Sequence, residues 1–255
     1  MSVAQKFSAA DPRVQLFTTD LEAFKFTAVK ISSLINAAIL EQGSANVILA
    51  AGNSIAKTLS FLSQNDAQWS QVKWFLADER CVDHDDEQRN QLQLTRVLQK
   101  SIGEKLGEII GPNSHDSPEE SASKYASRIE AINMFDFCLL GMGNDGHIAS
   151  LLPNHPALGS KEVCCVVNDS PNMPKKRITL TLKSLARTEN RILITTGASK
   201  QKAIKDFINN SQAPVRLFDP TAIIADQVAY KLKQFCFVVV SGHESEMSPT
   251  TFRNH

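Results

Sequence analysis

A histidine and an aspartate stand two residues apart in a glycine-rich stretch, and together they could carry out acid–base chemistry. The stretch FDFCLLGMGNDGHIASLLPNHP, residues 135–156, contains Asp145 and His147. A carboxylate beside an imidazole fixes the ring tautomer and raises its basicity, which gives a general base that works near neutral pH. The alternative is that Asp145 caps a turn and His147 only satisfies a backbone carbonyl. The position directly after a glycine-rich strand end favours the general base.

The same stretch matches the dinucleotide-binding pattern through Gly141, Gly143 and Gly146. That pattern requires a long helix after the third glycine, with its N-terminus aimed at a pyrophosphate. Pro153 and Pro156 end any helix within about two turns of Gly146. We therefore interpret the glycines as permissive positions, which let the backbone turn sharply and approach a ligand closely.

A second polar group follows the apolar run VKWFLA. Asp78, Glu79 and Arg80 come directly after it. They could form a surface ion-pair cluster of little consequence for stability. They could instead orient a polar substrate, with Arg80 donating to an anion or a developing oxyanion.

Cations in the second half of the chain favour a bound phosphate. Arg177 ends a basic triplet, and Lys200 and Lys202 lie at the expected start of a helix. Cations at a helix N-terminus oppose the helix dipole unless an anion is present. A solvated basic surface is the alternative for the triplet. We expect Arg177 and Lys200 to be phosphate ligands.

Other chemistries have little support. No HxxxH or CxxC spacing predicts a metal site, and neither Ser54 nor Ser150 lies in a G-x-S-x-G elbow. The five cysteines are odd in number, which favours reduced thiols in a cytoplasm. Cys138 is expected to be a small core residue.

Composition describes an ordinary soluble globular protein. The 255 residues include 27 basic and 27 acidic side chains, so a nucleic-acid partner is a poor expectation. The first 30 residues hold no signal-peptide core, and no stretch approaches the roughly 20 apolar residues that span a bilayer.

Short apolar runs that alternate with helical patterns predict a doubly wound, mostly parallel α/β sheet with helices on both faces. The expected strands are NVILA, VKWFLA, FDFCLL and RILITT, with TAII and FCFVVV as further candidates. A first helix is expected from an N-cap at Asp20 to Gly43. Ligands of such sheets bind at the carboxyl ends of the strands. Four strand ends therefore point at one crevice, followed by residues 52–54, 78–80, 141–147 and 197–200.

In order and spacing, four segments resemble the 6-phosphogluconolactonases. They are VILAAGNS, VKWFLADERCV with DEQRN, FDFCLLGMGNDGHIASLLPNHPAL, and KKRITLTLKSLARTENRILITTGASKQKAI. The resemblance covers about residues 20–232 of one expected domain, 1–255, and leaves the tail 233–255 without a counterpart. That family shares its fold with glucosamine-6-phosphate deaminases and with sugar-phosphate effector domains of some repressors.

The resemblance implies hydrolysis of 6-phospho-D-glucono-1,5-lactone to 6-phospho-D-gluconate in the oxidative pentose phosphate pathway. It implies no cofactor, no metal, no membrane and a cytoplasmic enzyme, as a monomer or small homo-oligomer. The implied catalytic residues are His147 as the base, Asp145 and Asp78. The implied substrate-binding residues are Arg80, Arg177, Lys200, Gly52, Asn53, Ser54 and Gly143.

Two departures from the family pattern keep alternatives open. The first loop reads Ala50-Ala51-Gly52-Asn53-Ser54-Ile55 where the family has Ser-Gly-Gly-Ser-Thr-Pro. After Gly-His the chain reads IASLLP, where deaminases resemble IAFNEP with a catalytic glutamate, and this favours the lactonase. An amino-sugar-phosphate deaminase or isomerase and a non-catalytic sugar-phosphate sensor remain the alternatives.

Overall fold

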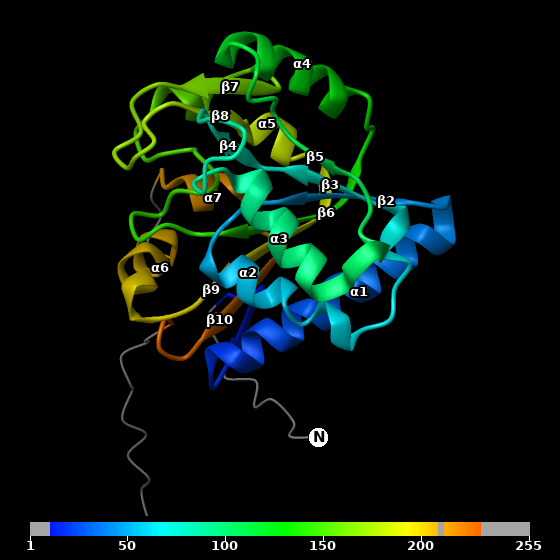
Figure 1. The fold of residues 1–255 in the computed structure, drawn as a ribbon. Helices are drawn as coiled ribbons and strands as arrows, with labels where there is room; N and C mark the ends of the chain where they lie inside the picture. Colours follow the sequence, from blue (N-terminus) through cyan, green and yellow to red (C-terminus); the bar gives the residue numbers. More distant parts are fainter. Residues whose placement is uncertain (1–10, 209–211, 231–255) are drawn as a thin grey trace, which may run out of the picture.

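A seven-stranded parallel sheet forms the centre of the molecule in the computed structural model, which describes residues 11–208 and 212–230 (Figure 1). Its strands are β1 (Val14–Phe17), β2 (Ala45–Leu49), β3 (Val72–Leu76), β5 (Ile109–Ile110), β6 (Phe135–Gly141), β9 (Thr188–Thr195) and β10 (Ala222–Asp226). Their order is β1-β10-β9-β6-β2-β3-β5, and each neighbouring pair is parallel. The predicted fold class is confirmed.

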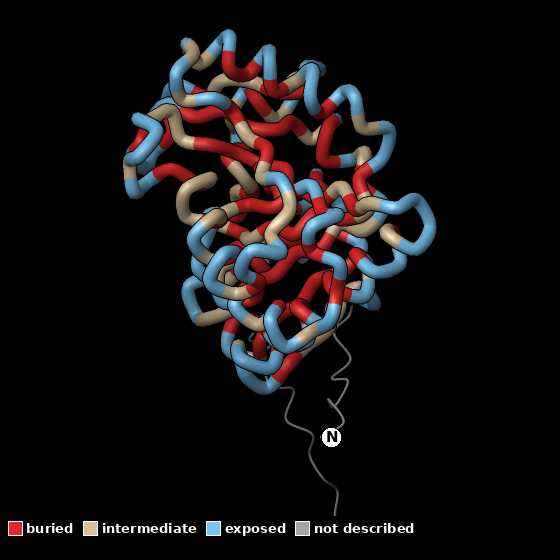
Figure 2. Tube along the Cα trace, turned by 45° about the vertical axis from the view of Figure 1, so that its right-hand side comes forward, coloured by how far each residue is buried: buried red, intermediate tan, exposed pale blue. Residues whose placement is uncertain are grey.

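Helices cover both faces of this sheet because its strands are apolar on both sides. The helices are α1 (Asp20–Gln42), α2 (Asn53–Leu59), α3 (Asn90–Ile102), α4 (Pro118–Glu130), α5 (Leu182–Leu185), α6 (Gln201–Ile208) and α7 (Pro214–Phe218). Val47 and Leu49 belong to a buried cluster that includes residues of α1, α2 and α3, whereas Ile48 belongs to a second cluster with residues of α4 to α7. Figure 2 shows buried segments running through the centre of the molecule, with exposed segments outside them.

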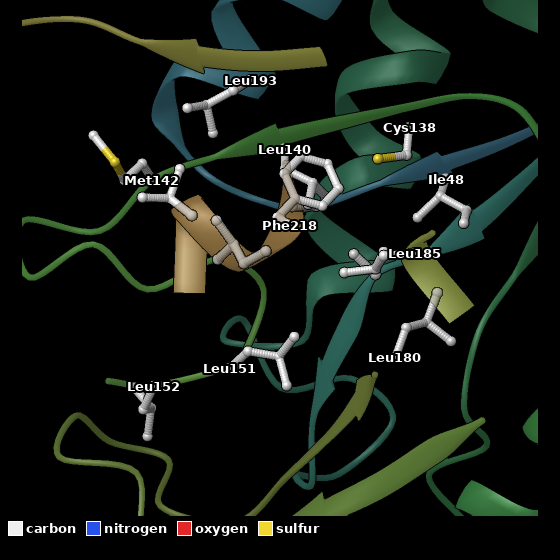
Figure 3. Close-up of a cluster of buried hydrophobic side chains, with 14 of the residues drawn as sticks. Ile48, Cys138, Leu140, Met142, Leu151, Leu152, Leu180, Leu185, Leu193 and Phe218 are labelled. Atoms are coloured by element: carbon white, nitrogen blue, oxygen red, sulfur yellow. The ribbon is translucent and has the colours of Figure 1, made fainter. Parts of the chain in front are cut away.

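A smaller antiparallel sheet lies beside the central one and was not predicted. It consists of β4 (Asp78–Arg80), β8 (Arg177–Leu180) and β7 (Cys164–Val167), in the order β4-β8-β7. The polar residues directly after VKWFLA therefore form a strand. Leu180 belongs to the buried cluster that also includes Leu140 and Leu151, so this sheet packs against the central one (Figure 3).

The N-cap of the first helix lies one residue earlier than expected. Thr19, not Asp20, is the N-cap, because its hydroxyl accepts from the backbone of Glu22 while the Glu22 carboxylate accepts from the backbone of Thr19. Gly43 ends the helix in the left-handed conformation, as the sequence predicted. A strand, β1, also precedes this helix and was not among the expected strands.

By length and composition alone α1 could cross a membrane, although no membrane-spanning stretch was predicted. In this structure the apolar residues Phe24, Ile31 and Ile35 of α1 are buried in the core of the protein. Of the remaining predictions, TAII lies in β10 and Cys138 is fully buried. The run FCFVVV and the tail 233–255 lie outside the described residues.

Candidate active site

The strand order reverses between β2 and β6, and a cleft opens at the carboxyl ends of these strands. Chain connections run from β2 outward to β3 and β5 on one side, and from β6 outward to β9 and β10 on the other. Such a switch point is where α/β sheets bind ligands. The cleft holds about 850 Å³, which suits a small-molecule site. All ten predicted site residues line it: Gly52, Asn53, Ser54, Asp78, Arg80, Gly143, Asp145, His147, Arg177 and Lys200.

His147 and Asp145 form a close pair on the loop after β6. The imidazole Nδ1 lies 2.6 Å from Asp145 Oδ1, which also accepts from the His147 backbone at 3.2 Å. Burial alone would raise the pKa of the Asp145 carboxyl, but the charge of His147 and its hydrogen bonds hold that pKa below its ordinary value. An ionised carboxylate can only accept, so Nδ1 carries the proton. Nε2 is then the nitrogen that can take a proton.

Gly143 is required by this pair because its missing side chain provides the space in which the imidazole lies. A Cβ on Gly143 would overlap Nδ1 and Cε1 of His147 and would come within 2.6 Å of Asp145 Oδ1. The Gly143 amide also donates to the His147 carbonyl at 2.8 Å. The glycine therefore permits a tight turn that folds the imidazole back over the loop.

Asp78 is buried at the start of β4 and is fixed by two neighbours. Ser150 Oγ donates to Asp78 Oδ2 at 2.6 Å, and Asn90 Nδ2 donates to the Asp78 carbonyl at 2.9 Å. The adjacent Glu79 lies away from the cleft and accepts from the first amides of α3, at Asn90 and Gln91. Of the two acids in this segment, only Asp78 lines the cleft.

Arg80 and Arg177 lie opposite each other in the small antiparallel sheet. Arg177 is 7 % exposed and donates to the carbonyls of Pro174 and Asn172. Burial lowers the pKa of Arg177; Asp78 opposes this shift and the charge of Arg80 adds to it. Two like charges directly opposite each other destabilise a sheet. An anion in the cleft would offset that repulsion.

Lys200 adds a third cation to the lining of the cleft and lies shortly after the end of β9. It closes a short 3-10 turn, Ala198–Lys200, which leads into α6 after Gly197. Its Nζ donates to Asn144 Oδ1 at 2.8 Å, and burial lowers its pKa while Asp145 opposes the shift. Lys200 is therefore linked to the loop that carries His147.

The loop after β2 contributes backbone and hydroxyl groups. Gly52 has a φ of 145°, which L side chains rarely adopt, and it precedes the first turn of α2. Ser54 Oγ lies 3.1 Å from Thr196 Oγ1, which joins the ends of β2 and β9. Ala51 is partly buried and lines the cleft. The lost family glycine therefore stands at the cleft wall.

Several cleft residues were missed by the sequence reasoning. Thr196 and Asn144 stand at strand ends already singled out, so the strand-end rule could have found both. Asn172 and Pro171 lie on a loop before β8 and give no such signal. Lys57 and Asp20 also line the cleft, and their charged groups lie 3.6 Å apart.

A metal site has no basis in the part of the chain that the structure describes. No group of three or more His, Cys, Asp or Glu side chains among those residues could hold a metal ion. The cleft therefore combines a histidine base of fixed tautomer, His147, with the cationic side chains of Arg80, Arg177 and Lys200.

Comparison with known proteins supports the resemblance. The family model for glucosamine-6-phosphate isomerases/6-phosphogluconolactonase matches residues 19–229. The 6-phosphogluconolactonase of Mycobacterium tuberculosis is 33% identical over 197 residues, which cover 71% of this chain and 80% of that protein. A probable 6-phosphogluconolactonase of Arabidopsis thaliana is 34% identical over 204 residues, 72% of this chain and 75% of that protein.

Solved structures agree on the fold. The 6-phosphogluconolactonase of Trypanosoma brucei superposes with a TM-score of 0.75 at 23% identity, over 87% of this chain and 98% of that one. At this identity the likeness is evidence for the fold alone. The family match covers most of the chain, and the two relatives each exceed 30% identity over more than two thirds of its length. The chain belongs to the family of glucosamine-6-phosphate isomerases and 6-phosphogluconolactonases.

Proposed function

We propose that this protein hydrolyses 6-phospho-D-glucono-1,5-lactone to 6-phospho-D-gluconate, with His147 as the general base. The observation that carries the proposal is the common cleft: the His147–Asp145 pair and the Arg80–Arg177 pair line the same cavity. The relatives named above are called 6-phosphogluconolactonases. Their substrate has one phosphate and one electrophilic carbonyl, which matches a cleft with cations and one base.

The base acts through the ring nitrogen that Asp145 leaves free. With Nδ1–H donated to the Asp145 carboxylate, Nε2 accepts a proton from water while the water oxygen bonds to the lactone carbonyl carbon. The ring C–O bond of the lactone then breaks, and the proton returns to the leaving oxygen. Asp145 stabilises the imidazolium that exists between these two steps. No cofactor is needed.

The cations hold and orient the substrate. Arg177 and Lys200 bind the phosphate, since buried and partly buried cations form strong charge-assisted hydrogen bonds with phosphate oxygens. Asp78 and Arg80 line the sugar site, and residues 52–54 allow close approach of the backbone. Gly143 leaves the space in which the imidazole lies. In cells the reaction belongs to the oxidative pentose phosphate pathway. Cys81, Cys138, Cys164 and Cys165 are free thiols, which fits a reducing cytoplasm.

The test is a coupled assay on freshly generated lactone, with the spontaneous rate subtracted. His147→Ala should lower kcat roughly a hundredfold to ten-thousandfold, which is the usual contribution of a general base.

His155→Ala is the matched control. His155 also pairs with an aspartate, Asp169, at 2.8 Å, but it does not line the cleft. Its kcat should stay within about twofold of wild type. Wild-type turnover in His147→Ala would remove the proposed base. Release of ammonia from glucosamine 6-phosphate would instead indicate a deaminase, and ligand binding without any turnover would indicate a sensor.

A further inference from the structure

Ser150 joins the loop that carries His147 to the small sheet that carries the two arginines. Its side chain is 1% exposed. Its hydroxyl donates to Asp78 Oδ2 at 2.6 Å, and its backbone amide donates to Thr179 Oγ1 at 3.3 Å. Asp78 lies 72 residues away along the chain. Ser150 therefore joins its own loop, which follows β6, to both β4 and β8 of the small sheet.

Both contacts fall on the same rung of the small sheet. Asp78 is paired with Thr179 in the antiparallel register, and Arg80 is paired with Arg177 two residues along. Side chains two residues apart on a strand share one face of the sheet. Ser150 is thus fastened to the face from which Arg80 and Arg177 reach the cleft.

The chain between Ser150 and His147 is held tightly. Ala149 has a φ of 48°, a left-handed conformation that a residue with a Cβ adopts only when its surroundings impose it. Ile148 and Leu151 on either side are fully buried and bridge to each other, the Leu151 amide donating to the Ile148 carbonyl at 2.8 Å. Figure 3 shows Leu151 and Leu152 among the buried side chains of the core cluster. A shift of Ser150 would therefore be passed on to His147.

We infer that Ser150 is a positioning residue, which sets the spacing between the His147 imidazole and the Arg80–Arg177 pair through its hydrogen bond to Asp78. The inference rests on the proposed function. With the phosphate held by Arg177 and the sugar lined by Arg80, the lactone carbonyl lies at a fixed distance from the small sheet. The His147 imidazole must therefore also lie at a fixed distance from that sheet. Loss of the bond should leave substrate binding intact and should misplace the base.

The experiment compares Ser150→Ala with Ser184→Ala. Ser184 is also fully buried, and its hydroxyl also donates over 2.6 Å, to the Val163 carbonyl, but it lies in α5 and does not line the cleft. The melting temperatures of both variants should fall below that of the wild type by a similar amount. Ser150→Ala should lose at least tenfold in kcat, since small misplacements of reacting groups are costly, with KM within about twofold of wild type. Ser184→Ala should keep both constants.

Two further variants make the result decisive. Asp78→Ala removes the acceptor of this bond, so adding Ser150→Ala to that variant should lower kcat no further. Ser150→Cys keeps a donor at this position, although a weaker one on a larger atom, so its kcat should lie between those of wild type and Ser150→Ala. If Ser150→Ala does not fold, the Cys variant decides, and an unchanged kcat there contradicts the inference.

Failure of the inference and failure of the proposed function give different results. An active wild type with equal kcat in Ser150→Ala and Ser184→Ala overturns the inference alone. An inactive wild type overturns the function, and the NMR signals of the His147 ring, identified by their loss in His147→Ala, then decide the positioning role. These signals should shift in Ser150→Ala and stay unchanged in Ser184→Ala. The opposite pattern overturns the inference.

Discussion

At the scale of single residues, the packing of His147 against Gly143 explains why a glycine stands at this position. No side chain of any size fits there without moving the imidazole, because the Cβ would occupy the place of Nδ1 and Cε1. Both His147 and Asp145 would have to rotate away from the loop, and their mutual hydrogen bond would be lost. The glycine is needed for the base and not for a nucleotide.

Gly143→Ala should therefore lower kcat/KM at least tenfold and destabilise the fold by about 1–3 kcal/mol, which is the usual cost of inserting atoms into a packed site. The measurements are the coupled lactone assay and urea denaturation. Gly159→Ala is the control, since a Cβ there meets nothing within 4 Å. Equal activity of the two variants would show that the imidazole does not depend on this packing.

At the scale of elements, α4 is joined to the central sheet by a hydrogen bond between two residues that do not line the cleft. The buried Tyr125 hydroxyl donates to the Leu76 carbonyl at 2.7 Å, where β3 ends. Burial raises the pKa of Tyr125 well above its ordinary value, so the hydroxyl stays protonated and remains a donor. This contact stabilises the layer of helices and has no part in the proposed chemistry.

Tyr125→Phe should lower the free energy of unfolding by about 1–3 kcal/mol, because the Leu76 carbonyl loses its side-chain partner in the core. The lactone kcat and KM should remain at wild-type values. Tyr230→Phe is the comparison, since the structure describes no hydrogen-bond partner for the Tyr230 hydroxyl, and its stability should change less. A loss of turnover in Tyr125→Phe with unchanged stability would contradict this division between scaffold and site.

The small sheet is the element on which the cleft depends most. β4 has only three residues and all three are charged, yet Asp78 and Glu79 are buried. They tolerate burial because each accepts hydrogen bonds: Asp78 from Ser150, and Glu79 from the start of α3. The same arrangement places Arg80 beside Arg177.

At the scale of the whole molecule, charge is distributed unevenly despite a net charge of zero. Arg80, Arg177, Lys200 and Lys57 line one cleft, while the acids Asp20, Asp78 and Asp145 there are each held near a positive group or a donor. A neutral protein with such a local cluster is suited to a small anion and not to a polyanion.

Arg177→Ala should raise the KM for the lactone roughly ten- to hundredfold, because a charge-assisted hydrogen bond contributes about 1.5–3 kcal/mol. kcat should change much less. Inorganic phosphate should raise the melting temperature of the wild type by mass action and that of Arg177→Ala by less.

Arg191→Ala provides the control for this prediction. Arg191 also donates to two backbone carbonyls, of Asp219 and Thr188, but it lies outside the cleft lining. It should keep the wild-type KM and the wild-type response to phosphate. An unchanged KM in Arg177→Ala would exclude this residue from phosphate binding.

Much of the fold could be predicted because it depends on local patterns. The runs around Ile48, Phe75, Cys138 and Leu193 are apolar without alternation, which is typical of strands buried on both faces, and helical spacing separates them. Parallel strands bring their carboxyl ends to one edge, so residues 52–54, 78–80, 141–147 and 197–200 could be assigned to one crevice. These four segments could be placed at the crevice because each follows directly after a predicted strand.

Only the tertiary structure decided which of these side chains meet. The three polar residues of β4 carry no strand pattern, and their partner strand begins almost one hundred residues later, so the small sheet could not be predicted. The alternation of a strand sends Glu79 away from the cleft while Asp78 and Arg80 enter it. Ser150 reaches Asp78 across 72 residues by a contact with no sequence signal. Local periodicity determines elements, whereas distances between side chains depend on how those elements pack.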